Sequence, residues 1–310
     1  MVFLREKLNR FLQRWPSRVQ LLRFLFFQAK SGYPLKRTFK MTLYGTEVSL
    51  SIRDRRAFLL SQHGGRGLQP ELIDAIVAIS QEMDSFVFLD VGGNYGEWSL
   101  ILSKQASKVI LIEPNPQLAE LARRNFAQHQ NVKVVEVALA ASTGSATMYQ
   151  RSTYSGGSSL WAEYLSSLDK KKWWGIGGME AITVQTESAR NVINSELPAL
   201  GAEVGVVVKI DVEGAEPLIL PDICDFLAER DAWVLVVEFN PTTIKSSGFD
   251  PTEVFSILNK LGTCRIFNQN KSSPRIPPTE FELKEEPSVT CDLIVTPRSP
   301  RQTSYAVRRE

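Results

Sequence analysis

Short apolar runs alternate with amphipathic stretches along most of the chain. Runs at 86–91, 108–113, 132–139, 204–211 and 233–240 predict strands that are buried on both faces. Between them lie apolar positions at helical spacing, as at 116–128, where Leu118, Leu121, Ala122 and Phe126 share one face. Two last runs, 264–267 and 289–295, predict a closing antiparallel strand pair. The pattern therefore predicts an α/β fold, a parallel sheet with helices on both faces.

The residues before the first buried strand have a different pattern. Alternating residues at 38–43 and 47–52, with a turn at 44–46, predict a β-hairpin. Pro70 predicts the start of a helix over 70–82. Apolar residues at helical spacing within 4–15, and an apolar stretch at 19–27, predict a helical arm over 1–37. At the other end, the polar residues 297–310 predict a disordered tail.

Three glycines follow the first buried strand, before a helix that starts near Trp98. Gly92, Gly93 and Gly96 let the backbone approach a ligand, and the helix N-terminus offers free N–H groups. Strand, glycine turn and helix is how α/β sheets hold nucleotide-like ligands. The Gly-x-x-x-Gly spacing differs from that of dinucleotide sites, and favours a ligand without a pyrophosphate, such as S-adenosylmethionine. A tight turn that binds nothing would use the same residues.

An acidic residue ends the second buried strand. Glu113 lies 23 residues after Asp90, which belongs to the first strand. An acid at this place bonds the ribose hydroxyls in nucleotide-binding sheets. The alternative is that Glu113 only caps the helix that follows.

Four segments resemble the FkbM-type methyltransferases: Asp90-Val-Gly-Gly-Asn-Tyr-Gly, Glu113-Pro-Asn-Pro, Gly156-Gly-Ser-Ser-Leu and Lys209-Ile-Asp-Val-Glu-Gly-Ala-Glu. The resemblance runs from about residue 39 to about residue 296, and the last segment is its most specific part. It implies a class I methyltransferase fold, S-adenosylmethionine as donor, and O-methylation of a hydroxyl on a sugar, glycan or other secondary metabolite. The donor-site residues are then Asp90, Gly92, Gly93, Asn94, Gly96, Glu113, Pro114, Asn115, Ala138, Ser158 and Ser159.

Two departures from the family pattern are visible. The first loop carries Gly92-Gly93-Asn94 where the family has Gly-Ala-Asn. The family's Thr-Leu-Asp-Asp is replaced by Thr183-Val-Gln-Thr, so two acids are missing there. Any role of that acidic pair is not expected in this chain.

An alcohol acceptor must lose its proton during methyl transfer, and a positioned carboxylate or histidine can take it. The candidates for this base are Asp211, Glu213 and Glu238, followed by His129. Each acid has a structural alternative, because Asp211 can neutralise Lys209 and Glu213 can cap a helix. A magnesium ion held by Asp211, Glu238 and Asn240 is a further alternative. No dedicated ligand spacing supports it, so no metal site is predicted.

The stretch 151–178 is predicted to be an irregular insertion. It is rich in glycine and serine and holds five large aromatic residues, Tyr154, Trp161, Tyr164, Trp173 and Trp174. Aromatic rings stack on sugar rings, so this stretch is a candidate acceptor site. A folded insertion with its own small aromatic core is the other interpretation.

Charge divides the chain into two parts. Residues 1–40 carry ten basic side chains and one acidic side chain, whereas the whole chain has a net charge of +2. The basic amphipathic arm, residues 1–30 in particular, suits either the surface of an anionic membrane or packing on the catalytic domain or on a second subunit. Nucleic acid is not an expected partner, because the rest of the chain is acidic.

Three cysteines without a C-x-x-C motif, and only two histidines, predict a reducing, cytoplasmic location and no zinc site.

Other function classes leave different signatures. A nucleic-acid amino-methyltransferase needs Asp/Asn-Pro-Pro-Tyr after the fourth strand, which Asp211-Val-Glu-Gly does not supply. A dehydrogenase is disfavoured by the glycine spacing. A scaffold protein that has lost catalysis stays an alternative, although the complete donor motif argues against it.

Overall fold

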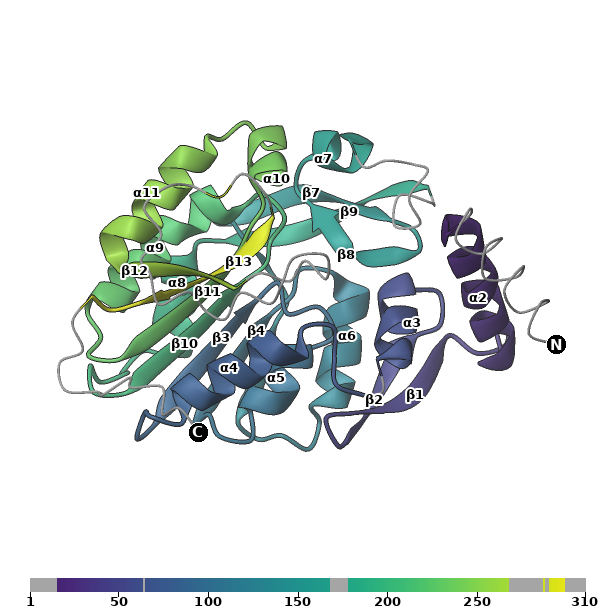
Figure 1. Cartoon of the computed structure of the whole chain (residues 1–310), viewed down its shortest axis with the longest axis horizontal. Helices are drawn as coiled ribbons and strands as arrows, with labels where there is room; N and C mark the ends of the chain where they lie inside the picture. The colour runs from purple at the N-terminus through teal and green to yellow at the C-terminus, as the bar shows by residue number, and fades with distance from the viewer. Residues whose placement is uncertain (1–15, 64, 168–177, 268–286, 288–289, 299–310) are drawn as a thin grey trace, which may run out of the picture.

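The computed structural model describes residues 16–63, 65–167, 178–267, 287 and 290–298. The predicted helix within 4–15 and residues 299–310 of the predicted tail lie outside the described residues. The described chain contains one large sheet, with a smaller sheet and a hairpin beside it (Figure 1).

The large sheet has the strand order β12-β13-β11-β10-β3-β4-β5. Strands β11, β10, β3, β4 and β5 are parallel, and β13 runs antiparallel to both of its neighbours. The bounds are β3 Phe86–Val91, β4 Lys108–Ile112, β5 Val132–Val135, β10 Gly205–Ile210, β11 Trp233–Phe239, β12 Thr263–Phe267 and β13 Cys291–Thr296. This order, with the closing antiparallel strand next to β11, is the class I methyltransferase topology that the sequence predicts.

Helices cover both faces of this sheet, so all residues of β3 and β10 are buried. One face is covered by α4 (Pro70–Ser80) and α5 (Glu97–Leu102), and the other by α8 (Ala189–Glu196), α9 (Glu216–Ala228) and α11 (Pro251–Leu261). Neighbouring residues of a strand enter opposite cores, as Phe88 and Leu89 do. This alternation also decides which face each charged strand residue occupies.

The N-terminal elements pack at one side of the sheet. Strands β1 (Thr38–Leu43) and β2 (Thr46–Ser51) form an antiparallel hairpin that packs on α6 (Pro116–Asn125). Helix α2 (Pro16–Lys30) contacts α3 (Arg55–Gln62), where Phe24 and Phe58 meet edge to face. The sequence pattern missed α3, because eight residues are too few to establish an apolar period.

Two predictions in the middle of the chain were wrong. The run 132–139 is not one strand, since β6 (Ala138–Leu139) leaves the large sheet and joins a second sheet in the order β6-β9-β7-β8. The stretch 151–178 is not irregular throughout, since it contains β8 (Tyr154–Ser159) and α7 (Ala162–Ser167). Pairing with β7 (Gly144–Arg151), itself paired with β9 (Met179–Glu187), holds β8 in place. Its glycines and serines have low β-propensity, so composition alone does not predict it.

Candidate active site

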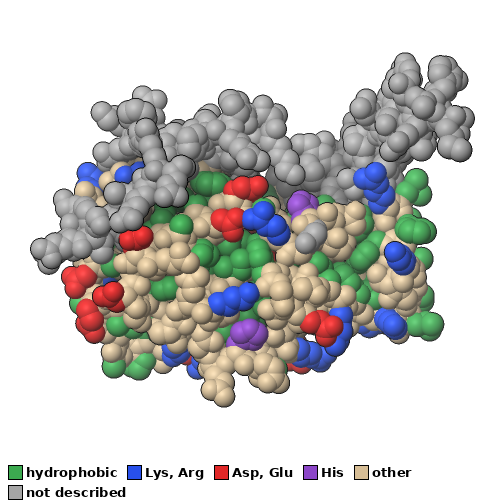
Figure 2. Space-filling view, turned by 60° about the horizontal axis from the view of Figure 1, so that its bottom comes forward, with side chains coloured by type: hydrophobic (Ala, Val, Ile, Leu, Met, Phe, Trp, Pro, Cys, Tyr) green, Lys and Arg blue, Asp and Glu red, His purple; other side chains and the backbone are tan. Residues whose placement is uncertain are grey.

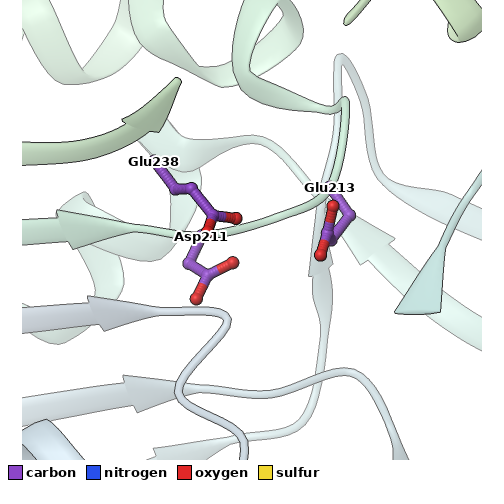
Figure 3. Close-up of side chains that lie close together, drawn as sticks. All are labelled: Asp211, Glu213 and Glu238. Atoms are coloured by element: carbon purple, nitrogen blue, oxygen red, sulfur yellow. The ribbon is translucent and has the colours of Figure 1, made fainter. Parts of the chain in front are cut away.

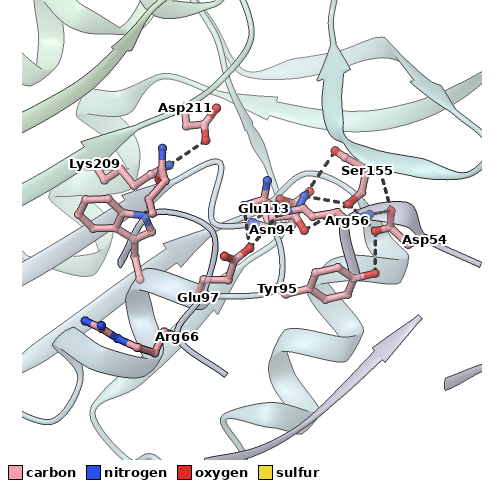
Figure 4. A network of polar contacts seen from close by, with 12 residues as sticks. Asp54, Arg56, Arg66, Asn94, Tyr95, Glu97, Glu113, Ser155, Lys209 and Asp211 are labelled. Carbon is pink, nitrogen blue, oxygen red and sulfur yellow. Dashed lines mark hydrogen bonds and ion pairs between the residues drawn. The ribbon is translucent and has the colours of Figure 1, made fainter. Parts of the chain in front are cut away.

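Charged side chains lie on one face of the large sheet near the carboxyl ends of β3, β10 and β11. Asp90 and Lys209 are direct cross-strand neighbours, and Glu238 lies on the next strand. Lys209 Nζ donates to Asp211 Oδ2 at 2.9 Å (Figure 4), and it lies 5.7 Å from the centroid of the Trp98 ring. The lysine inside this apolar strand therefore has one acidic neighbour directly after its own strand and another on the adjacent strand.

The lysine keeps Asp211 ionised. Burial lowers the pKa of Lys209, but Asp211 and Asp90 outweigh it and the net shift is upward. At Asp90 burial dominates, so its pKa is raised despite Lys209 and the hydrogen bond that Ser99 Oγ donates at 2.6 Å. Burial by itself would raise the pKa of Asp211, yet Lys209 and Arg56 together hold this pKa below the usual range.

The glycines after β3 are required by close packing. Gly92 has φ +77°, and a Cβ there would lie 1.9 Å from the carbonyl oxygen of Asp211. Gly96 has φ +81°, and a Cβ there would lie 2.5 Å from the Phe126 ring and 2.8 Å from Leu111. The turn after β3 thus packs directly on the chain that leaves β10, and Gly92 brings the two motifs together.

Gly92→Ala is expected to lower the free energy of unfolding by about 2–5 kcal/mol, because the new Cβ strains a left-handed residue and overlaps a backbone oxygen. Gly45→Ala is the matched control. Gly45 has φ +81° and no heavy atom within 4 Å of such a Cβ, so it carries only the backbone cost, about 1–2 kcal/mol. Urea unfolding measures both variants, and equal losses would contradict the contact with Asp211.

Glu113 links the turn after β3 to the start of α6. Its Oε2 accepts the N–H of Asn94 at 2.8 Å, and its Oε1 accepts the N–H of Asn115 at 2.9 Å. Burial raises the pKa of Glu113 to about 7 in spite of these hydrogen bonds. Asn115 caps α6, since its Oδ1 accepts the N–H of Gln117 at 2.9 Å. The alternative that Glu113 caps this helix was wrong, and each carboxylate oxygen keeps a lone pair for a hydroxyl donor.

A cavity lies against these loops, with about 700 Å³ of empty space when the open solvent at its mouth is included. The predicted donor-site residues that line it are Gly92, Asn94, Glu113, Pro114, Ala138, Ser158 and Ser159. The other predicted residues, Asp90, Gly93, Gly96 and Asn115, are not among the described residues of its wall. Apolar side chains on the same wall include Ile112, Val137, Leu139 and Met148.

A second cavity adjoins the first. Four residues line both, namely Arg56, Gly156, Asp211 and Glu213. The rest of its described wall is mostly polar or aromatic and consists of Leu68, Gln69, Tyr154, Gly157, Tyr164, Glu238 and Asn240. A group that moves from the first cavity to the second therefore passes Asp211 and Glu213.

The three predicted acids form a cluster in this region (Figure 3). One carboxylate oxygen from each of Asp211, Glu213 and Glu238 lies within 4.8 Å of the others. Burial and the charge of Asp211 raise the pKa of Glu213 to about 8. The charge of Asp211 and burial raise the pKa of Glu238 well above its usual range. Near neutral pH, Asp211 thus carries the negative charge and the two glutamates tend to hold protons.

The family model of the FkbM methyltransferase domain matches residues 90–263, more than half of the chain. The chain belongs to the FkbM methyltransferase family. It is a methyltransferase, and its methyl donor is S-adenosylmethionine. The matched segment begins at Asp90 and includes the three clustered acids. The family predicted from the four sequence segments is confirmed.

No curated protein matches this FkbM methyltransferase in sequence. One similar solved structure is precorrin-6y C5,15-methyltransferase from Geobacter metallireducens, with 15% identity, 73% of this chain and 89% of that chain covered, and a TM-score of 0.37. Another is a SAM-dependent O-methyltransferase from Thermotoga maritima, with 11% identity and a TM-score of 0.36. The match covers 88% of this chain and 79% of that chain. These likenesses are too distant to inform the activity, which rests on the family.

The first cavity suits the donor of the FkbM methyltransferases chemically. Its apolar wall, with Ile112 and Met148, fits an adenine ring. The carboxylate of Glu113 beside it would accept ribose hydroxyls through its remaining lone pairs. When bound, the donor supplies the methyl group that is transferred to the acceptor.

Sequence reasoning missed two residues that connect this site to α3. Asp54 accepts hydrogen bonds from the N–H of Arg56 at 2.9 Å, the hydroxyl of Tyr95 at 2.8 Å and the Oγ of Ser155 at 2.5 Å (Figure 4). Arg56 forms an ion pair with Glu97 at 2.7 Å. An aspartate before a short helix predicts a cap, but nothing local shows that Arg56, two residues later, faces two cavities.

Two predicted roles are not supported by position. His129 precedes β5, at the end of that strand remote from the cavities, and its ring packs against Phe126 with centroids 5.3 Å apart. Asn240 Oδ1 accepts the N–H groups of Thr242 and Thr243 at 3.2 Å, so it caps α10 (Pro241–Ser246). The acid grouped with Asp211 and Glu238 is Glu213, which the magnesium alternative did not include.

Proposed function

We propose that the enzyme transfers the methyl group of S-adenosylmethionine to a hydroxyl of a sugar, glycan or other secondary metabolite held in the second cavity. The observation that supports this most directly is that Asp211 and Glu213 line both cavities. An alcohol needs a base where its oxygen meets the methyl group, and these carboxylates lie between the two spaces. The amides of Gln69 and Asn240 and the ring of Tyr154 suit a hydroxyl-rich acceptor.

We assign Glu213 as the base. Its pKa of about 8 gives it a high proton affinity, whereas Lys209 keeps the proton affinity of Asp211 low. Its Oε2 is covered and has no hydrogen-bond partner among the described residues. Glu238 lines only the second cavity, so it lies on the acceptor side alone. Asp211 and Lys209 would then orient the Glu213 carboxylate and balance the charge around it.

A screen of acceptors tests the proposed function. Purified enzyme is incubated with S-adenosylmethionine and a panel of glycosides, polyketides and matched amines, and release of S-adenosylhomocysteine is measured. Turnover with hydroxyl acceptors and none with the amines is expected. Calorimetric titration of the donor, with Asp90→Ala and Glu113→Ala variants, checks the donor site separately. Donor binding without transfer to any hydroxyl, but with transfer to an amine, would refute O-methylation.

Metal-assisted O-methylation is a second candidate, favoured by the oxygens of Asp211, Glu213 and Glu238 within 4.8 Å of one another. A divalent cation held by these carboxylates would lower the pKa of the acceptor hydroxyl. Chelation with EDTA separates the two candidates. Loss of activity that Mg²⁺ restores would favour the metal, and unchanged activity would favour Glu213 acting alone.

We also propose a cytoplasmic location. Cys224, Cys264 and Cys291 are free thiols, as is usual in a reducing compartment. In the part of the chain that the structure describes, no helix is both long and apolar enough to cross a bilayer.

A further inference from the structure

Helix α2 has two apolar faces, and only one of them is covered. Phe24 is 2% exposed and packs with Phe27 against Phe58 of α3. Leu22, Leu25 and Phe26 lie on the other side and are 66%, 50% and 72% exposed. The spacing i, i+3, i+4 places these three side chains in one stripe along the helix.

Exposed large hydrophobic side chains gather around this helix. Among the described residues they are Leu22, Leu25, Phe26, Tyr33, Leu35 and Met179, and only Met179 is remote from α2 in sequence. Leu35, in the turn after the helix, is 95% exposed. An exposed stripe of large apolar side chains, such as that of Leu22, Leu25 and Phe26, is typical of a site of interaction.

The same region is basic. Arg23, Lys30, Lys36 and Arg37 are exposed, and no ion pair of theirs occurs among the described residues. In the sequence no acidic residue occurs between Glu6 and Glu47. At the right-hand edge of Figure 2, the end of the molecule where α2 lies in Figure 1, green and blue side chains lie next to one another.

We propose that this surface, called the α2 patch and made of Leu22, Leu25, Phe26 and Leu35 with the four basic residues above, docks the enzyme on an anionic phospholipid membrane. An apolar stripe on a projecting helix, with basic side chains beside it, is the arrangement that lies in a lipid interface. The basic residues would attract anionic headgroups while the stripe enters the acyl boundary. A protein with an acidic groove is a less suitable partner than a membrane, because the basic side chains and the apolar stripe lie on the convex surface of a helix.

The patch is close in structure to the proposed active site. Helix α2 contacts α3, and α3 carries Arg56, which lines both cavities. Docking through α2 would therefore hold the enzyme by a helix that neighbours the site, while leaving the residues of both cavities untouched.

Vesicle flotation of the full chain tests the proposal. The protein is mixed with phosphatidylcholine vesicles that either contain or lack phosphatidylserine, at low and at raised salt. We expect binding to the anionic vesicles that raised salt weakens. A Leu22→Ser/Phe26→Ser variant is expected to lose about tenfold or more of the partition coefficient, because it removes two large inserted side chains. Met179→Ser removes an exposed hydrophobic residue that is not part of the α2 patch, and it should bind like the wild type.

The double variant Arg23→Gln/Lys30→Gln, which removes two basic side chains of the α2 patch, should bind anionic vesicles more weakly. Its control is Lys245→Gln/Lys260→Gln, which removes two basic side chains on α10 and α11 and should bind like the wild type. Circular dichroism and donor titration show that each variant is folded. Equal binding to neutral and anionic vesicles, or wild-type binding by the Leu22→Ser/Phe26→Ser variant, would overturn the proposal. So would a dimer in light scattering that disappears in that variant, because a second copy would then be the occupant of the patch.

Discussion

Replacing Glu213 with glutamine is expected to lower kcat by about 10²- to 10⁴-fold, the contribution that a positioned general base makes. Glutamine keeps the size of the side chain and cannot take the acceptor proton. The donor cavity keeps its other walls, so calorimetric affinity for S-adenosylmethionine should change little. Glu253→Gln on α11 is the control, because Glu253 is exposed and belongs to neither cavity.

The pH profile gives an independent test of the same residue. Burial and Asp211 raise the pKa of Glu213 to about 8, so the basic form is lost as the pH falls below that value. For the wild type at saturating donor, kcat/KM for the acceptor, whose proton the base takes, should rise up to about pH 8 and then level off. The Glu213→Gln variant should lose this rise. A variant with wild-type kcat and an unchanged profile would remove Glu213 from the role of base.

Replacing Lys209 with methionine is expected to lower the free energy of unfolding by about 3–5 kcal/mol, because removal of one partner leaves buried charges uncompensated. Lys209 is 4% exposed, and its Nζ is 2.9 Å from Asp211 and next to Asp90 across the sheet. Methionine fills most of the same volume, so the loss reports on charge more than on packing. Lys245→Met, at an exposed position of α10, is the control.

The sign of the pH dependence follows from the shift at Asp211. Its pKa is lowered in the folded protein, so it contributes stability above its unfolded pKa and loses that contribution as the pH falls. The difference in the free energy of unfolding between the wild type and Lys209→Met should therefore become smaller as the pH is lowered, because the carboxylates take up protons. Adding Asp211→Asn to the variant should recover part of the loss. If the two free energies of unfolding differ by less than about 1 kcal/mol at every pH, the Lys209–Asp211 pair contributes no net stability.

Local patterns in the sequence were sufficient for the sheet and for the donor motif. Strands β3, β10 and β11 are continuous apolar runs because both of their faces are covered, and such runs are visible without a structure. Asp90, Glu113 and Asp211 stand at or next to the ends of β3, β4 and β10, where parallel strands present their carboxyl ends together. The glycine turn needs backbone conformations that few other residues adopt, so it too is apparent in the sequence.

By itself, then, the sequence determined the strands of the large sheet, the methyltransferase family with its class I topology, and the acids that gather at one edge of the sheet. Only the tertiary structure decided which of them line a cavity, that Glu213 joins two cavities, and that Arg56 faces both. It also showed that Ala138 belongs to a second sheet and that α2 has an uncovered apolar face. These facts depend on contacts between residues far apart in the chain, such as Asp54 with Ser155, 101 positions later, and no local period or motif encodes them.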